Sequence, residues 1–80
     1  MTDRKRRRDY LEPFARRLTA LVEETGLSQE AVALAVGSTK STFWFYLNAR
    51  AEPKTRALIA IADYFGVSID YLLGRTDTRR

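Results

Sequence analysis

The residue types that most often do chemistry in proteins are either absent from this 80-residue chain or scattered along it. The chain contains no cysteine and no histidine. This removes disulfides, thiolate metal sites, and the commonest general base and metal ligand. The carboxylates and the lysines Lys40 and Lys54 show no recognisable catalytic spacing. We therefore expect no enzyme activity, no metal site and no cofactor.

The remaining candidates for a function are the basic side chains. Their distribution along the chain tells more about a binding partner than the net charge of +4 does. Residues 1–8 and 75–80 are both strongly basic, whereas residues 9–74 hold six basic and eight acidic groups. Within residues 9–74, one stretch is basic and opposed only by Glu52. A one-sided basic surface suits a phosphate backbone, and the alternative is an ordinary solvated face. The basic groups of this stretch are Lys40, Arg50, Lys54 and Arg56.

Two short helices joined by a tight turn are predicted within residues 27–49. Gly37 ends the first helix, because glycine supplies the positive φ that a helix end often needs. The second helix is expected over about residues 40–48, and the pair forms a helix-turn-helix. Good N-cap residues precede both helices: Ser28 for the first, and Ser38 or Thr39 for the second.

Three further helices are predicted around this motif, which makes the chain all-α with one modest core. The first begins between Asp9 and Pro13, the fourth begins near Pro53, and a short fifth follows Ser68. Arg17, on the polar side of the first helix, is expected to face water. Apolar residues at helical spacing are expected to form the core: Phe14, Leu18, Leu21, Leu58, Ile61, Phe65, Ile69 and Leu72.

Four short motifs occur in a fixed order: G-L-S-Q at Gly26–Gln29, the turn glycine Gly37, S-T at Ser41–Thr42, and G-V-S-I-D-Y-L-L-G at Gly66–Gly74. Each motif alone is weak. The set resembles the helix-turn-helix DNA-binding domains of phage repressors, Cro proteins and their bacterial relatives, of the xenobiotic-response-element type. The resemblance covers roughly residues 14–77. It implies a compact five-helix, lambda-repressor-like domain that binds double-stranded DNA with the second motif helix as its recognition helix.

The outward face of the recognition helix would read base edges in the major groove. Phe43 and either Tyr46 or Leu47 should point into the core, because they lie three to four residues apart. Lys40 can donate to guanine O6 and N7, and Ser41 can bond a base or a phosphate. The predicted base-contacting residues on the outward face are Lys40, Ser41, Trp44 and Phe45.

Trp44 and Phe45 depart from the pattern of the resembled family, in which polar or small residues usually stand at these positions. Three interpretations stay open. One ring could pack on the core or on the basic arm formed by residues 1–8. Both rings could make apolar contact with DNA, for example with a thymine methyl group. Alternatively, a protein partner or a second copy of the chain could cover this apolar face.

Phosphate contacts would position the domain without reading sequence. The resemblance places Gln29 and Asn48 against the DNA backbone. Asn48 could instead adopt a left-handed cap conformation, because Ala49 stands where relatives often have glycine. The basic arm could neutralise phosphates or serve only as a solubilising tail. The predicted phosphate-contacting residues are Gln29, Thr42, Asn48, Arg50, Lys54, Arg4, Lys5 and Arg6.

The chain is expected to divide into a flexible basic arm (1–8), a DNA-binding domain (9–74) and a frayed polar tail (75–80). Tyr71 and Leu73 are left over after the core is filled, which favours a two-fold contact in a homodimer. Tyr71 could equally be a partly exposed core residue. No apolar run is long enough for a signal peptide or a membrane span, so a cytoplasmic protein is expected.

These features together predict a sequence-specific DNA-binding transcriptional regulator, expected to be a repressor that blocks or repositions polymerase sterically. The alternative is a protein–protein interaction module derived from a helix-turn-helix, which would use the aromatic face of the same helix.

Overall fold

The computed structural model describes the backbone of residues 3–80 and the side chains of residues 10–80. This part of the chain forms five α-helices and no strand, so the predicted all-α class is confirmed. None of these helices has the length and apolarity that crossing a membrane would take. In chain order they are α1 (Asp3–Thr25), α2 (Gln29–Ala35), α3 (Lys40–Leu47), α4 (Thr55–Phe65) and α5 (Ile69–Leu72).

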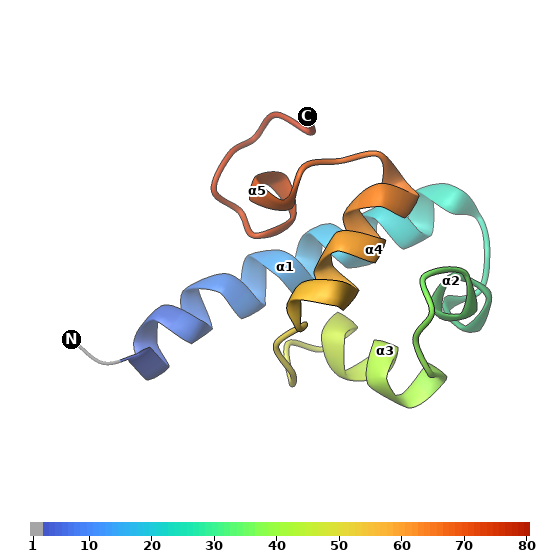
Figure 1. Cartoon of the computed structure of the whole chain (residues 1–80), viewed down its shortest axis with the longest axis horizontal. Coiled ribbons are helices and arrows are strands. Elements are labelled where there is room, and N and C mark those ends of the chain that lie inside the picture. The colour runs from blue at the N-terminus through green and yellow to red at the C-terminus, as the bar shows by residue number, and fades with distance from the viewer. Residues whose placement is uncertain (1–2) are drawn as a thin grey trace.

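The longest helix, α1, runs through the molecule as a spine (Figure 1). Both α3 and α5 pack against α1, while α2 packs against α3 and α4 packs against α5. In the view of Figure 1, α3 lies below the spine and α5 lies above it. The two motif helices are therefore held on one side of α1, away from the last helix.

The core draws side chains from every helix. The predicted core residues Phe14, Leu18, Leu21, Ile61 and Leu72 are confirmed as buried, whereas Leu58, Phe65 and Ile69 are partly buried and pack against the edge of the core. Burying one such side chain stabilises a fold by about 1.5–3 kcal/mol. The largest of the almost fully buried side chains, in chain order, are Phe14, Leu18, Val32, Phe43, Ile61 and Leu72.

Helix α1 begins earlier than the sequence predicts. The expected start between Asp9 and Pro13 is wrong, since the helix already includes residues 3–9 and Pro13 lies inside it. Arginine and lysine have high helix propensity, so a basic segment can prolong a helix. The ring of Pro13 lies against Gly74, where an added Cβ would come 2.6 Å from the Cβ of Pro13. This close contact packs the chain just after α5 against α1.

Hydroxyl side chains cap α2, α3 and α5. Ser28 accepts a hydrogen bond from the N–H of Ala31 at 3.1 Å, which confirms the predicted cap of α2. Thr39 rather than Ser38 caps α3, and Ser68 caps α5 as predicted. Each cap satisfies one backbone donor that the first turn of a helix leaves without a partner.

Candidate nucleic-acid interface

A tight turn sets the direction in which α3 leaves α2. Gly37 has φ +77°, a left-handed conformation that glycine adopts without steric cost. The N–H of Ser38 donates to the carbonyl of Ala33 at 2.8 Å, which closes the end of α2. Thr39 then accepts from the N–H of Thr42 at 3.1 Å and starts α3. Local hydrogen bonds therefore determine the geometry of the turn.

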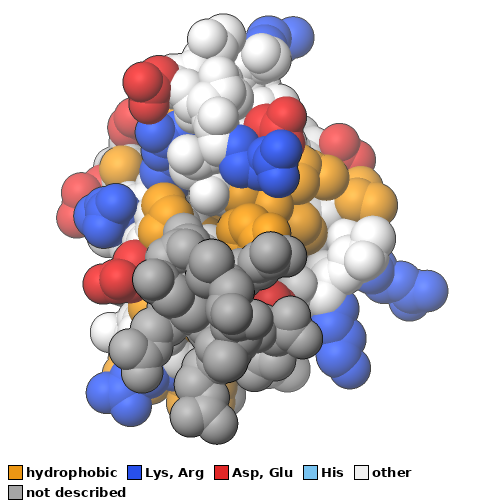
Figure 2. Space-filling view, turned by 90° about the vertical axis from the view of Figure 1, so that its left-hand side faces the viewer, with side chains coloured by type: hydrophobic (Ala, Val, Ile, Leu, Met, Phe, Trp, Pro, Cys, Tyr) orange, Lys and Arg blue, Asp and Glu red, His pale blue; other side chains and the backbone are white. Residues whose placement is uncertain are grey.

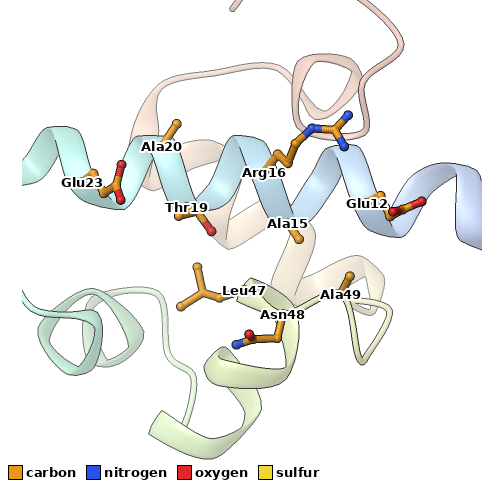
Figure 3. A pocket seen from close by; sticks show the side chains of 9 residues that line it. All are labelled: Glu12, Ala15, Arg16, Thr19, Ala20, Glu23, Leu47, Asn48 and Ala49. Carbon is orange, nitrogen blue, oxygen red and sulfur yellow. The ribbon is translucent and has the colours of Figure 1, made fainter.

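Two aromatic residues fix the inward side of α3. Phe43 and Tyr46 are buried, and their rings meet edge to face with centroids 6.5 Å apart. Tyr46 also meets Phe14 of α1 edge to face at 6.1 Å, and burial raises the pKa of its hydroxyl. Leu47 is half-buried and points toward α1 (Figure 3). The prediction that Phe43 and either Tyr46 or Leu47 point into the core is confirmed, with Tyr46 buried and Leu47 only partly buried.

The opposite side of α3 is open to solvent. Trp44 and Phe45 are 46% and 44% exposed, and their rings pack edge to face with centroids 5.4 Å apart. Lys40 and Ser41, one helical turn earlier, are also exposed. A hollow of 340 Å³ is lined by these four residues and by Gln29 at the start of α2. We call this surface the recognition face, and its residues are Gln29, Lys40, Ser41, Trp44 and Phe45.

Lys40 has a weak intramolecular partner. Its Nζ lies 4.0 Å from the nearer carboxylate oxygen of Glu30, and both side chains are well exposed. Such surface ion pairs contribute about 0–1 kcal/mol. The ammonium group can therefore leave Glu30 for another acceptor at little cost.

A second hollow, of 730 Å³, lies between the start of α3 and the start of α4. Its lining includes Thr42 and Lys54, two of the predicted phosphate-contacting residues. Arg56 lies there too, although only the clustering of charge along the sequence pointed to it. Glu52 shares the hollow. With Glu30 beside Lys40, this side of the molecule is basic but not purely so.

The end of α3 differs from its expected geometry. The left-handed residue is Ala49, with φ +57°, whereas Asn48 has φ −107°. The alternative that Asn48 adopts a left-handed cap conformation is therefore wrong. Instead, the Asn48 amide donates from Nδ2 to the carbonyl of Trp44 at 2.9 Å. One N–H of that amide remains for another acceptor.

Arg50 follows with an exposed side chain, and its backbone N–H donates to the carbonyl of Phe45 at 2.8 Å.

Three of the predicted phosphate-contacting residues lie outside the described side chains. The side chains of Arg4, Lys5 and Arg6 belong to the part of α1 for which the structure describes the backbone alone. The coloured surface in Figure 2 mixes basic, acidic and hydrophobic side chains. Among residues 10–80, no group of carboxylates is close enough together to hold a metal ion.

The polar tail is not frayed. Arg79 donates two hydrogen bonds to the carboxylate of Glu24, at 3.1 and 2.6 Å, and lowers the pKa of that carboxyl. The carbonyl of Arg79 also accepts from the N–H of Ser68 at 2.6 Å. Polar side chains near the end of a chain can thus hold it in place when they find partners on another element.

Arg17 is half-buried and does not face water as predicted. Its guanidinium donates to the carbonyls of Tyr71 and Thr76 at 2.9 and 2.5 Å, and it pairs with Asp77 at 3.0 Å. It also lies 4.2 Å from the centroid of the Tyr71 ring. We call this set of residues the clasp, and its members are Arg17, Glu24, Tyr71, Asp77 and Arg79.

The residues predicted for a dimer contact have partners within the chain. The ring of Tyr71 lies against Arg17, and Leu73 lines a hollow of 270 Å³ together with Leu11 and Phe14. Both are partly buried rather than fully available. Large apolar side chains that are more exposed occur elsewhere and were missed, because one precedes α2 and the others lie outside the apolar side of their helices. They are Leu27, Leu34, Ile59 and Tyr64.

Comparison with known proteins agrees with this geometry. The helix-turn-helix domain family matches residues 13–73, most of the chain. The chain is also 33% identical over 64 residues to "Uncharacterized HTH-type transcriptional regulator YobD" of Bacillus subtilis (strain 168). That match covers 80% of this chain and 57% of YobD, so the chain spans little more than half the length of this relative. No solved structure matches the chain significantly. The protein therefore belongs to the helix-turn-helix domain family.

Proposed function

We propose that this chain is a DNA-binding transcriptional regulator whose α3 enters the major groove of double-stranded DNA. The observation that carries the proposal is the exposure of the recognition face on the second helix of a helix-turn-helix. In this motif the second helix lies in the major groove and presents side chains to base edges. The name of YobD, an HTH-type transcriptional regulator, supports the same function.

The proposed roles divide the exposed residues into two groups. Lys40 and Ser41 hydrogen-bond to base edges, and Trp44 and Phe45 supply apolar contact in the groove. A second group binds phosphate oxygens, which sets the register of the protein on the duplex. Its members are Gln29, Thr42, Asn48, Arg50 and Lys54, together with Arg4, Lys5 and Arg6 of the basic arm.

The proposal extends to the oligomeric state of the protein and to its effect on transcription. A homodimer with contacts at Tyr71 and Leu73 would place two copies of α3 about one turn of DNA apart. Bound to an operator in the cytoplasm, such a dimer would act as a repressor by excluding polymerase sterically. The four sequence motifs support a relationship to phage repressors and Cro proteins.

The first test is a salt-titrated gel shift after selection of bound duplexes from a random pool. We expect one sequence to be enriched and its affinity to fall steeply with salt, because phosphate contacts release counterions. Failure to enrich any sequence would contradict the proposal.

Two variants then separate the proposed roles. Lys40→Ala should cost about 1–3 kcal/mol of binding free energy and relax the base preference at one position. Arg50→Ala should weaken all sequences alike and reduce the slope of log affinity against log salt by about 1. Equal, sequence-independent losses from both variants would contradict the assignment of roles.

A second candidate function follows from the exposed ring pair. Large exposed apolar groups often mark protein contacts, so the recognition face could instead bind another protein. In that case the selection would enrich no duplex, and Trp44→Ala would leave the residual DNA affinity unchanged.

A further inference from the structure

The recognition face combines two kinds of surface in one hollow. Two rings, Trp44 and Phe45, stand edge to face and are each almost half exposed. Around them lie an ammonium group, a hydroxyl and an amide, from Lys40, Ser41 and Gln29. An apolar centre with hydrogen-bonding groups at its edge is suited to a ligand that is apolar at one point and polar beside it.

The rings constrain which part of a base edge can lie against them. Phe45 carries no hydrogen-bonding group, and Trp44 carries only its indole N–H. A polar base atom pressed against the ring faces would lose its hydrogen bond to water without gaining another. In the major groove the largest apolar group on any base pair is the C5-methyl of thymine.

We infer that Trp44 and Phe45 form an apolar seat for the C5-methyl group of a thymine. This inference rests on the proposed function, because it requires α3 to lie in the major groove. Lys40 stands one helical turn before Trp44 on the same exposed side of α3, where it can donate to O6 and N7 of a neighbouring guanine. The bound site therefore contains a thymine beside a guanine.

The direct test removes the methyl group and nothing else. Each thymine of the selected duplex is replaced in turn by deoxyuridine, which keeps the hydrogen-bonding edge of thymine. At one position per α3, we expect the affinity to fall about three- to fivefold, the effect of burying one methyl group. Because the wild-type chain is used, this measurement does not depend on whether a variant folds.

A variant pair then assigns the effect to the rings. Trp44→Ala should bind the thymine and deoxyuridine duplexes with equal affinity. Tyr64→Ala is the matched control, because Tyr64 is 40% exposed and pairs edge to face with Phe65 at 5.0 Å on α4. The control should keep the discrimination of the wild type.

Each result distinguishes the inference from the function on which it rests. If a sequence is selected but no deoxyuridine substitution weakens its binding, the thymine seat is wrong and the proposed function stands. Discrimination that persists in Trp44→Ala and Phe45→Ala would also overturn the seat. If no duplex is enriched at all, the proposed function fails, and the inference fails with it.

Discussion

The recognition face and the clasp carry similar residue types but use them in opposite ways. In the clasp, Arg17 and Arg79 each bind carbonyl or carboxylate oxygens of the same chain at hydrogen-bonding distance. On the recognition face, Lys40 has a single weak carboxylate contact at 4.0 Å. The aromatic groups differ in the same way, since Tyr71 is covered by Arg17 while Trp44 remains 46% exposed.

This difference indicates which polar groups serve stability and which are available to a ligand. A side chain already bonded within the chain must give up that bond before it binds anything else. A side chain with no strong partner loses only its hydration. We therefore expect changes in the clasp to alter the free energy of unfolding, and changes on the recognition face to alter binding.

The largest expected effect comes from the contact between Gly74 and Pro13 of α1. Gly74→Ala should destabilise the fold by about 3 kcal/mol, because a Cβ there would both meet the ring of Pro13 and occupy a left-handed conformation. Gly37→Ala, in the turn before α3, has the same backbone conformation but open space around it. It should cost only about 1–2 kcal/mol. Urea denaturation of both variants tests this, and equal losses would contradict it.

Arg17→Ala should destabilise the fold by about 2 kcal/mol, since two backbone carbonyls lose a charged donor and Tyr71 loses the nearer of its two cations. Arg16→Ala is the matched control, because Arg16 is the exposed neighbour on the same helix. It should change the free energy of unfolding by no more than about 0.5 kcal/mol. If Arg17→Ala unfolds at the same urea concentration as Arg16→Ala, the clasp has no stabilising role.

A smaller effect is expected at the end of α3. Ala49 holds a left-handed conformation that costs about 1–2 kcal/mol for a residue with a Cβ. Ala49→Gly should raise the free energy of unfolding by about 0.5–1 kcal/mol, after allowing for the greater chain entropy of glycine. Thermal denaturation measures the gain. A lower melting temperature would show that the methyl group of Ala49 contributes packing that outweighs the strain.

The smallest expected effect is the loss of the contact between Glu24 and Arg79 at low pH. The pKa of Glu24 is lowered by its hydrogen bonds from Arg79, so the contact is fully present above the ordinary glutamate pKa of about 4.3. It should be lost as the pH falls through the lowered pKa, which releases Arg79 from α1. NMR signals of the Tyr71 ring, which Arg79 approaches within 5.7 Å, should report this release. Glu24→Gln should abolish the transition, and a transition unchanged in that variant would refute the assignment to Glu24.

Local features of the sequence predicted much of the fold. Ser28, Gly37 and Ser68 act at the helix ends where they were expected, because capping depends on residues a few positions apart. Helical spacing likewise identified the buried sides of α1 and α3. The start of α1 was missed, since no local stop signal separates the basic segment from the helix that follows.

The candidate site was predicted in part. The residues of the recognition face could be chosen from the sequence because four of them share one side of a single helix. The positions of Glu30 beside Lys40, and of Arg56 in one hollow with Thr42, could not be predicted in this way, since they depend on how α2 and α4 lie against α3.

The sequence by itself determined that five helices form, the caps of α2 and α5, and the side of α3 that faces outward, because each depends on interactions within about one or two helical turns. Only the tertiary structure decided that Arg17 supports Tyr71 and the tail, and that Gln29 joins α3 in one hollow. Those contacts join residues far apart along the chain. Their formation requires the packed core to bring the helices together first.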